Sequence, residues 1–554
     1  MPVMTFNKGY VERLIGSKLE SVEFEDTLWK MGFSVEGSTS DEISIEITPN
    51  RPDMLDAVGF ARAFRLFTGK SKQYEYSLKD RKPELTVKVG NAVKSVRPYI
   101  ALLTARNLSF TEESLTNLLG ATDKFTDTYG RKRKKIAIGI HNLDSVSGSI
   151  VYDAYKEGRY VPLGSSKESN YAEVLSSHEK GIRYSEALGK RHNMYPALKD
   201  GKGTLALIPI LNSERTKVTK ATKNLLIDIT GQSEYLVSKT ADLLASVFMD
   251  MGADVGRVEV AYTGSRLVTP VMQSRYIAIG TKRIESELGA TVGANAAMAM
   301  GNRMGYSTEL SGTKVVFGVP SYRVDIINEQ DVLEDLLIAY GYDNIAPLPV
   351  PSVAQGSAED IVSYRTRLED LMLGLGFNHM YNSYLSNDPV NFAMMRHKPS
   401  EYAVRIKNPK TEAATLMRTW LLPSLMRNVG MSLNERMPLN VFELDMAFNV
   451  EDGKPMESYH LAAVSCSPKA NFNDIKAMVD AVCSSIGIAY HVERSENPSF
   501  IEGRCVRMIS NGIDMGVFGE MHPEVLSNFK IEEPAIGFEI TLPIPAMKRR
   551  EIEQ

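Results

Sequence analysis

The most specific pattern in the sequence is PSYRVDIINEQDVLEDLLIAYGYD, residues 320–343. Its second half predicts a helix over residues 329–340 that Gly341 closes. In this helix Asp331, Glu334 and Asp335 stand at positions i, i+3 and i+4, so we expect their carboxylates on one face. Asp325, just upstream, could converge on the same point.

Carboxylates packed this closely repel one another, so a positive partner is expected beside them. A hard cation with oxygen ligands, such as Mg²⁺, is the natural candidate. The alternative is a solvated acidic face, whose charges are favourable in the first turn of a helix. The spacing alone leaves both readings open.

Composition places the chain among globular proteins. It has 554 residues, 43% hydrophobic and 24% charged, with 64 Lys+Arg against 68 Asp+Glu and a net charge of −4. This excludes disordered and fibrous classes. No apolar run reaches the roughly 18 residues that cross a bilayer, and the N-terminus lacks the basic and apolar regions of a secretory signal. We therefore expect a cytoplasmic protein that does not bind membranes.

The cysteines and the usual catalytic motifs give little information about function. None of Cys466, Cys483 and Cys505 lies in a C-x-x-C pair, so we expect reduced packing residues. Gly69-Lys70-Ser71 resembles the end of a P-loop, but Phe64 occupies the position of the upstream glycine. There is no H-E-x-x-H and no G-x-S-x-G. Generic motifs therefore leave the function open.

On either side of the acidic helix, changes in composition and turn- or linker-forming residues divide the chain into four segments. We therefore expect a multidomain α+β protein. Residues 1–88 predict a small α/β domain, with helices over 23–31 and 54–67 and a strand at 43–47. Residues 89–268 are strand-rich, and their short apolar runs read as buried strands. These runs are residues 136–140, 205–211 and 225–230.

The acidic helix lies in the third segment, residues 269–347. Alternating prolines at residues 346–351 then mark a linker, because they suit neither a helix nor a central strand. The last segment, residues 356–554, alternates helices with strands at 441–444 and 517–520. We expect it to form an antiparallel sheet.

Residues 320–343 resemble the B5 domain of phenylalanyl-tRNA synthetase β subunits, with its pattern P-x-[YWF]-R-x-D, D-[LV]-x-E-[ED] and an aromatic-Gly-Tyr-Asp end. Other stretches match the archaeal and eukaryotic form of the same family, in the right order over nearly the whole chain. They are ITPNRPDML (47–55), YGRKRKKIAIGIH (129–141), NSE (212–214), TKVT (216–219), IDITG (227–231), NP (408–409), MRT (417–419), LPSL (422–425), FE (442–443) and GEMHP (519–523).

The resemblance implies a domain for each segment. These are an N-terminal B1-like domain (1–88), a B3/B4 editing and tRNA-binding domain (89–268), a small winged-helix-like B5 domain (269–347) and a class II synthetase-like B6/B7 core (356–554). In this family the α subunit activates phenylalanine. In agreement, GVFGEM (516–521) lacks the arginine that a class II motif 3 requires. Arg418 in MRT is therefore expected to be structural or interfacial.

The resemblance also implies partners and a metal. The chain would act as the β subunit of phenylalanine–tRNA ligase, in an α2β2 complex that binds ATP, phenylalanine and tRNA(Phe). No anticodon-binding extension follows residue 545, as in the archaeal type. The positions aligned with the family's metal ligands imply a structural Mg²⁺. They are Asp325, Asp331, Glu334 and Asp335.

The B3/B4 domain is the expected second active site. An apolar pocket rejects an added hydroxyl by only about 10², so a phenylalanine enzyme needs a second sieve that hydrolyses Tyr-tRNA(Phe). Asp228 and Thr230 share one face of a strand, and the resemblance places both in the editing pocket. Without it, a strand-end Asx turn is the simpler reading. Asn212 and Glu214 are further candidates.

The basic run at residues 131–135 fits contact with tRNA phosphates, although its charge equally suits a solubilising loop. The resemblance favours RNA for Arg131 and Arg133. Two departures weaken the editing prediction. Ala206 precedes Leu-Ile-Pro-Ile where the family has a small polar residue, and a family glutamine is replaced by Thr122 or Asp123, depending on alignment.

Three readings therefore compete. The first is an editing β subunit, and the second is a scaffold subunit with a degenerate editing pocket. The third is a free-standing nucleic-acid-binding protein that uses residues 290–304 as a winged-helix element. That stretch offers Arg303 as its main positive charge, which is poor for phosphate binding, and we expect no DNA partner.

Overall fold

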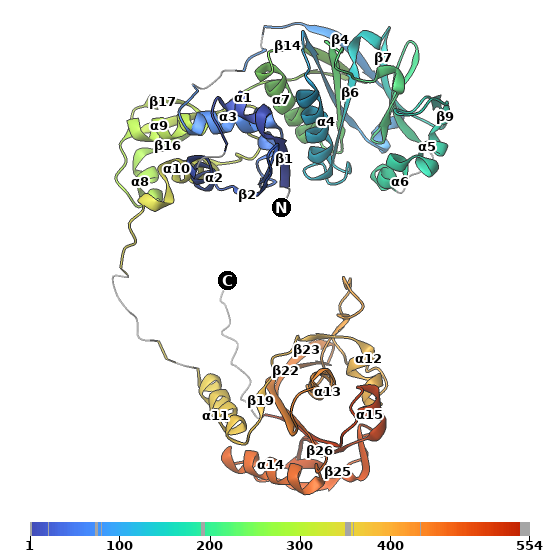
Figure 1. Ribbon diagram of the computed structural model, residues 1–554, viewed down its shortest axis with the longest axis vertical. Coiled ribbons are helices and arrows are strands. Elements are labelled where there is room, and N and C mark those ends of the chain that lie inside the picture. Colours follow the sequence, from blue (N-terminus) through green and yellow to red (C-terminus); the bar gives the residue numbers. More distant parts are fainter. Residues whose placement is uncertain are drawn as a thin grey trace. The chain divides into compact units, whose positions relative to one another are not determined.

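The computed structural model describes residues 3–19, 22–71, 76–78, 80–189, 194–349, 356–357, 359–432 and 434–542. The chain forms two compact units, Met1–Pro349 and Val350–Gln554, each considered by itself (Figure 1). Together they confirm a multidomain α+β protein. Val350 and Pro351 of the predicted linker and the end of the last segment, 543–554, lie outside the described residues.

The first unit begins with a small three-stranded antiparallel sheet in the order β1-β3-β2. Its elements are β1 (Val3–Asn7), α1 (Lys8–Ile15), α2 (Val22–Lys30), β2 (Ser34–Ser38), β3 (Glu42–Glu46) and α3 (Ala57–Phe67). Helix α3 begins later than predicted, because residues 52–54 form a 3-10 turn and Asp56 caps the helix. Gly59 lets that turn pack closely, since a Cβ there would lie 1.9 Å from the carbonyl oxygen of Asp53.

A ten-stranded mixed sheet follows, in the order β12-β11-β10-β7-β4-β14-β5-β13-β6, with β15 paired to β14. Its strands are β4 (Pro83–Val89), β5 (Tyr99–Arg106), β6 (Ile136–Asn142), β7 (Ile150–Tyr155), β10 (Tyr195–Asp200), β11 (Gly203–Leu207), β12 (Leu211–Asn212), β13 (Leu225–Gly231), β14 (Asp254–Tyr262) and β15 (Ser265–Thr269). The sheet takes in β4, so it starts before the expected boundary at 89. The apolar run 205–211 is two strands, because the chain turns at residues 208–210.

Helices cover this sheet and join it to the N-terminal elements. They are α4 (Glu112–Asp127), α5 (Tyr171–Ser177), α6 (Glu179–Tyr184) and α7 (Glu234–Asp250), with the short pair β8 (Arg159–Tyr160) and β9 (Ser169–Asn170) nearby. Helix α7 packs against β5, β13 and β14 (Figure 1). One hydrophobic core connects Phe60 of α3, Ile227 of β13 and Phe248 of α7. The first two sequence segments therefore fold as one body.

The unit ends with a three-stranded antiparallel sheet in the order β16-β18-β17. Its elements are β16 (Arg275–Gly280), α8 (Thr281–Leu288), α9 (Ala294–Arg303), β17 (Ser307–Ser311), β18 (Lys314–Val319) and α10 (Glu329–Tyr340). The predicted helix 329–340 is confirmed with its exact bounds. Asn328 and Asp331 form a capping box at its start, and Gly341 ends it at φ 92°.

The second unit is built on a seven-stranded sheet, β19-β22-β23-β27-β26-β25-β24. Its strands are β19 (Asn378–His379), β22 (Leu439–Glu451), β23 (Lys454–Cys466), β24 (His491–Arg494), β25 (Phe500–Ser510), β26 (Ile513–Met521) and β27 (Ala535–Thr541). All pairings are antiparallel except β19 with β22, so an antiparallel sheet is found. Around it lie α11 (Asp360–Gly374), α12 (Asp388–Asn391), α13 (Leu422–Met431), α14 (Phe472–Ser485), α15 (Pro523–Asn528) and the pair β20 (Leu385–Ser386) and β21 (Leu416–Met417).

Two expectations from composition can be checked in the fold. All three cysteines are free and buried, as predicted. Within the described part of the chain, no helix has both the length and the apolar character that a membrane span requires.

Candidate functional site

A small pocket opens beside β13, at the turn between β11 and β12. Its cavity volume is about 20 Å³, far below the roughly 300–1,000 Å³ of drug-sized sites, so it suits one small group. Asp228 and Thr230 of β13 both line it, as their spacing predicts, and only 2% and 0% of their surfaces are exposed. Asn212 of β12 and Ala206 of β11 lie on the facing wall.

Asp228 belongs to a buried polar chain that the sequence did not reveal. Its Oδ2 lies 3.0 Å from His141 Nε2, and His141 Nδ1 lies 2.8 Å from Thr216 Oγ1. Because a carboxylate only accepts, Nε2 donates to Asp228. The carboxylate has room only because Gly139 faces it across the β6–β13 pair, where a Cβ would lie 2.1 Å from Oδ2. Asp228 is therefore held in one position.

Thr230 is oriented by Arg97, a second residue that sequence analysis missed. Arg97 Nε donates to Thr230 Oγ1 at 3.0 Å, and another guanidinium nitrogen donates to the Thr230 carbonyl at 2.7 Å. Burial lowers the pKa of Arg97 to about 10, which still leaves it charged at neutral pH. Since the Thr230 oxygen accepts from Arg97, its own proton is available to a ligand in the pocket.

Arg133 and Arg131 differ from each other in placement. The Arg133 guanidinium is buried, donates to the Ile210 carbonyl at 2.7 Å and to Asp123 at 2.9 Å, and stacks 4.0 Å from the ring of Tyr184. The guanidinium therefore stabilises the pocket wall. A contact with a tRNA phosphate would require it to face solvent. Arg131 is exposed on the tight turn that precedes it.

Of the two remaining editing candidates, Asn212 lies at the pocket and Glu214 does not. Asn212 lines the pocket and donates to the Ile140 carbonyl at 3.0 Å, which leaves its side-chain oxygen available. Glu214 instead accepts from the Gly164 backbone at 2.6 Å and pairs with Lys217 at 3.1 Å, away from the pocket lining. The structure thus brings together Asp228, Thr230 and Asn212, and leaves Glu214 outside.

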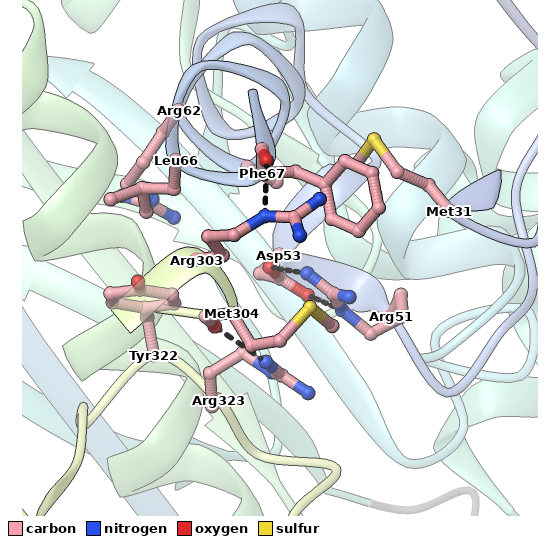
Figure 2. A pocket seen from close by; sticks show the side chains of 11 residues that line it. Met31, Arg51, Asp53, Arg62, Leu66, Phe67, Arg303, Met304, Tyr322 and Arg323 are labelled. Atoms are coloured by element: carbon pink, nitrogen blue, oxygen red, sulfur yellow. Dashed lines mark hydrogen bonds and ion pairs between the residues drawn. The ribbon is translucent and has the colours of Figure 1, made fainter. Parts of the chain in front are cut away.

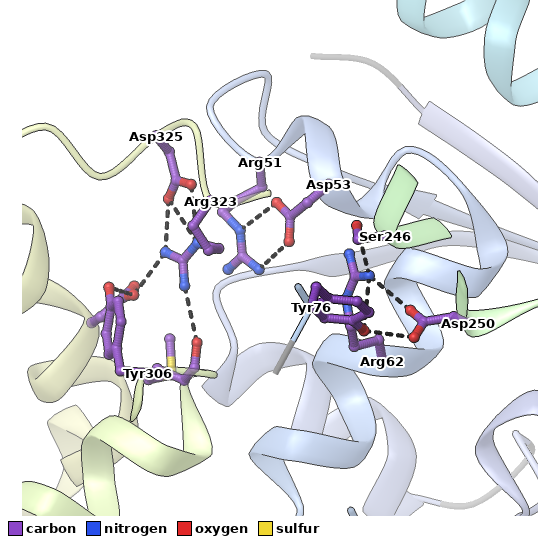
Figure 3. Close-up of polar contacts among 11 residues, drawn as sticks. Arg51, Asp53, Arg62, Tyr76, Ser246, Asp250, Tyr306, Arg323 and Asp325 are labelled. Atoms are coloured by element: carbon purple, nitrogen blue, oxygen red, sulfur yellow. Dashed lines mark hydrogen bonds and ion pairs between the residues drawn. The ribbon is translucent and has the colours of Figure 1, made fainter. Parts of the chain in front are cut away.

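The four carboxylates expected to hold Mg²⁺ do not converge. Asp325 pairs with the Arg323 guanidinium at 2.7 Å (Figure 3). Asp335 pairs with the same guanidinium, also at 2.7 Å. Asp331 accepts the backbone N–H groups of residues 327 and 328, at 2.6 and 2.8 Å. Glu334 points to solvent while Asp335 is buried, so the expected shared face is wrong.

Arg323 therefore supplies the positive partner that the spacing argument required. Its side chain is 1% exposed and lies between two of the four carboxylates. Among the residues that the structure describes, no group of three or more His, Cys, Asp or Glu side chains could hold a metal ion. As they lie, these residues do not fit Mg²⁺.

In the second unit, Arg418 is a structural residue. It pairs with Glu443 at 2.5 Å, each side chain being 1% exposed, and donates to the Met446 carbonyl at 3.0 Å. Asn382 donates to both oxygens of Glu443, at 3.1 and 2.8 Å. Its remaining terminal nitrogen has no hydrogen-bond partner among the described residues and is itself buried, so the contacts of Arg418 are internal to this unit. The geometry agrees with the expectation that Arg418 is a structural residue.

Comparisons with known proteins agree along the chain. The model of the phenylalanyl tRNA synthetase beta chain CLM domain matches residues 346–542, and that of the tRNA synthetase B5 domain matches residues 277–342. The chain is 34% identical to the phenylalanine–tRNA ligase beta subunit of Archaeoglobus fulgidus, over 98% of each chain. Identity to that of Pyrococcus abyssi is 33%, covering 98% of this chain and 99% of the relative.

A solved structure also resembles part of this chain. It is an N-terminal fragment of the phenylalanyl-tRNA synthetase beta subunit from Pyrococcus horikoshii, with a TM-score of 0.59 and 30% identity. The match covers 62% of this chain and 100% of the fragment.

Proposed function

This chain belongs to the family of phenylalanine–tRNA ligase β subunits, and we propose that it supports the catalytic α subunit, binds tRNA(Phe) and hydrolyses mischarged Tyr-tRNA(Phe). The complex joins phenylalanine to tRNA(Phe) at the expense of ATP, and activation takes place on the α subunit. The buried Arg418–Glu443 pair supports this division of labour. An α2β2 assembly that works in the cytoplasm is part of the proposal.

The pocket at β13 carries the editing proposal. A tyrosyl group differs from a phenylalanyl group by one hydroxyl, and Asp228 and Thr230 offer that hydroxyl an acceptor and a donor. A phenylalanyl group would leave the buried Asp228 carboxylate without this partner. Sites built to bind a hydroxyl reject the analogue that lacks it by roughly 10⁴–10⁵, because buried polar groups are left unpaired. The pocket would thus select tyrosine.

The lining residues point to recognition more than to covalent catalysis. Among the described residues that line the pocket there is no Ser, Cys or His, and His141 lies behind Asp228. No side chain offers a nucleophile backed by a base. The proposal therefore has water attack the ester, with a ribose hydroxyl of the tRNA itself aiding proton removal while Asp228 holds the substrate.

The test is deacylation of Tyr-tRNA(Phe) by the chain assembled with its α partner. Asp228→Ala should slow hydrolysis by about 10² or more, since it removes the tyrosine contact. Asp144→Ala is the matched control, because that residue is exposed in the same domain and its carboxylate, among the described residues, accepts one hydrogen bond, from Asn224 at 2.9 Å. Equal hydrolysis by wild type and Asp228→Ala would exclude this pocket.

The second candidate is a scaffold subunit without editing. Ala206 favours it, since this alanine lies on the pocket wall and offers no hydrogen bond where the family has a small polar residue. A complex that charges phenylalanine and hydrolyses no Tyr-tRNA(Phe) would establish this alternative.

Mg²⁺ at Asp325, Asp331, Glu334 and Asp335 stays a separate proposal that rests on the resemblance. Glu334 is the exposed member of the set, so a bound ion would need further ligands from water or from a partner subunit. Its test is the Mg²⁺ dependence of subunit association. Glu334→Gln should reduce that dependence, whereas Glu309→Gln, an exposed carboxylate on β17, should not. Identical behaviour of both variants would remove the proposal.

A further inference from the structure

A second pocket lies between α3, α9 and the loop at residues 320–325, away from β13 (Figure 2). Its cavity volume is about 20 Å³, which leaves room for one small group. Four arginines line it, together with one carboxylate, Asp53, and an apolar wall. The arginines are Arg51, Arg62, Arg303 and Arg323. The sequence pattern gave no reason to expect them in one place.

Two of these arginines belong to Arg-x-Asp motifs that fold in the same way. Arg51 grips Asp53 with Nε and a terminal nitrogen, at 2.9 and 2.8 Å. Arg323 grips Asp325 through the same pair of atoms, at 3.0 and 2.7 Å (Figure 3). Such forked pairs fix the plane and direction of each guanidinium. Both cations are thereby held at the pocket wall.

The other two arginines have donors to spare. Arg62 is 1% exposed and uses one terminal nitrogen to bind Asp250 at 2.7 Å and Ser246 at 3.1 Å. Its Nε and its other terminal nitrogen have no hydrogen-bond partner among the described residues. The ring of Tyr322 stacks 3.9 Å from this guanidinium and covers one of its faces, which satisfies no N–H in the guanidinium plane.

Arg303 lacks a carboxylate partner in the described part of the chain. Its guanidinium donates to the carbonyls of Phe67 and Ala339, at 2.9 and 2.8 Å. Burial lowers the pKa of Arg303, which shows that its surroundings do not fully offset the loss of water. The same two contacts turn Arg303 inward, so it is not presented to a nucleic acid by α9.

The charges around this pocket are balanced overall but not evenly placed. The carboxylates that offset Arg62 and Arg323 are Asp250, Asp325 and Asp335, and none of them lines the pocket. Four guanidinium groups and a single chelated carboxylate therefore face the space. Water could satisfy the free N–H groups, but it would bring no charge to Arg303. Arg303 is half-buried, and even partial burial is costly for a cation that has no counter-ion.

We propose that this pocket binds one small oxyanion, a phosphate or carboxylate group, through Arg303 and Arg62. The ligand would join α3 to α9 and so tie the N-terminal elements to the 269–347 segment. Arg51 and Arg323 are held by their own aspartates and would border the ligand without moving. The proposal does not depend on editing at β13.

Isothermal titration of the full chain with inorganic phosphate, at constant ionic strength, tests this directly. Wild type should bind with one-to-one stoichiometry, and Arg303→Gln should weaken the affinity about tenfold or more, as loss of a charge-assisted hydrogen bond requires. Arg266→Gln is the control, because that arginine is 74% exposed on β15 and should bind as wild type does. No saturable heat, or equal affinity in Arg303→Gln, would overturn the proposal.

Titrations with other ligands identify the source of the oxyanion, and a melting-temperature measurement covers the case in which the variant does not fold. ADP binding more tightly than phosphate would assign the site to a nucleotide, and succinate binding more tightly would assign it to a carboxylate. Chloride competing as well as phosphate would contradict an oxyanion site. If Arg303→Gln does not fold, the wild-type melting temperature decides, because a ligand of the native state must raise it. No rise in phosphate relative to chloride would then refute the site.

Discussion

Replacing Arg418 by Met should destabilise the second unit without removing the activity of the complex. The substitution leaves Glu443 buried and charged, with 1% of its side chain exposed. Removing one partner of a buried ion pair costs about 3–5 kcal/mol. Asn382 still donates two hydrogen bonds to Glu443, so we expect the lower end, about 3 kcal/mol. At roughly 2–4 °C per kcal/mol for a unit of this size, the melting transition should fall by about 6–12 °C.

The double variant Arg418→Met with Glu443→Leu separates this loss from a general packing defect. Replacing a whole buried pair by apolar groups is often neutral, so the double variant should recover most of the stability. Urea and thermal unfolding, followed by circular dichroism, give the three free energies of the cycle. Aminoacylation by the assembled complex, measured below the lowered transition, should persist. Unchanged stability in Arg418→Met together with lost aminoacylation would refute the structural role.

Three shorter predictions follow from the first unit. His141→Asn should reduce Tyr-tRNA(Phe) hydrolysis about tenfold through its effect on Asp228 while the fold is retained, and unchanged hydrolysis would remove His141 from the site. Burial alone would raise the pKa of the Asp53 carboxyl, but the forked pair with Arg51 holds this pKa below 3.8. The contribution of the pair to stability is therefore complete above about pH 4 and is lost as the pH falls further. Arg51→Leu should consequently move acid unfolding to higher pH. Arg131→Gln should lower the salt dependence of tRNA binding by about one unit of slope, and an unchanged slope would separate Arg131 from the RNA.

The sequence correctly predicted those structural features that depend on residues close together along the chain. The helix 329–340 was exact because its cap residues and its terminal glycine lie within the segment itself. Asp228 and Thr230 share a face because side chains alternate along any strand. Chain-wide motif order likewise anticipated the family that the comparisons establish.

Contacts between residues that are far apart in the sequence could not be predicted from local patterns. Arg97 reaches Thr230 from the segment just before β5, and His141 reaches Asp228 across the β6–β13 pairing, so neither contact could be seen in the spacing of the sequence. Arg133 lies in a basic run, which normally marks a solvated surface, but the tight turn at 131–133 directs it inward. The pairing of Arg323 with Asp335 of the acidic helix and with Asp325 upstream of it could not be predicted from the helix, because Arg323 lies outside its period.

The most direct measurement of the central claim is the ratio of hydrolysis rates for Tyr-tRNA(Phe) and Phe-tRNA(Phe) on the wild-type complex. Single-turnover deacylation of each ester, with enzyme in excess, gives this ratio without interference from recharging. A pocket that pairs the tyrosine hydroxyl with Asp228 and Thr230 predicts faster hydrolysis of the tyrosyl ester by a factor of about 10² or more. Equal rates for the two esters would contradict it.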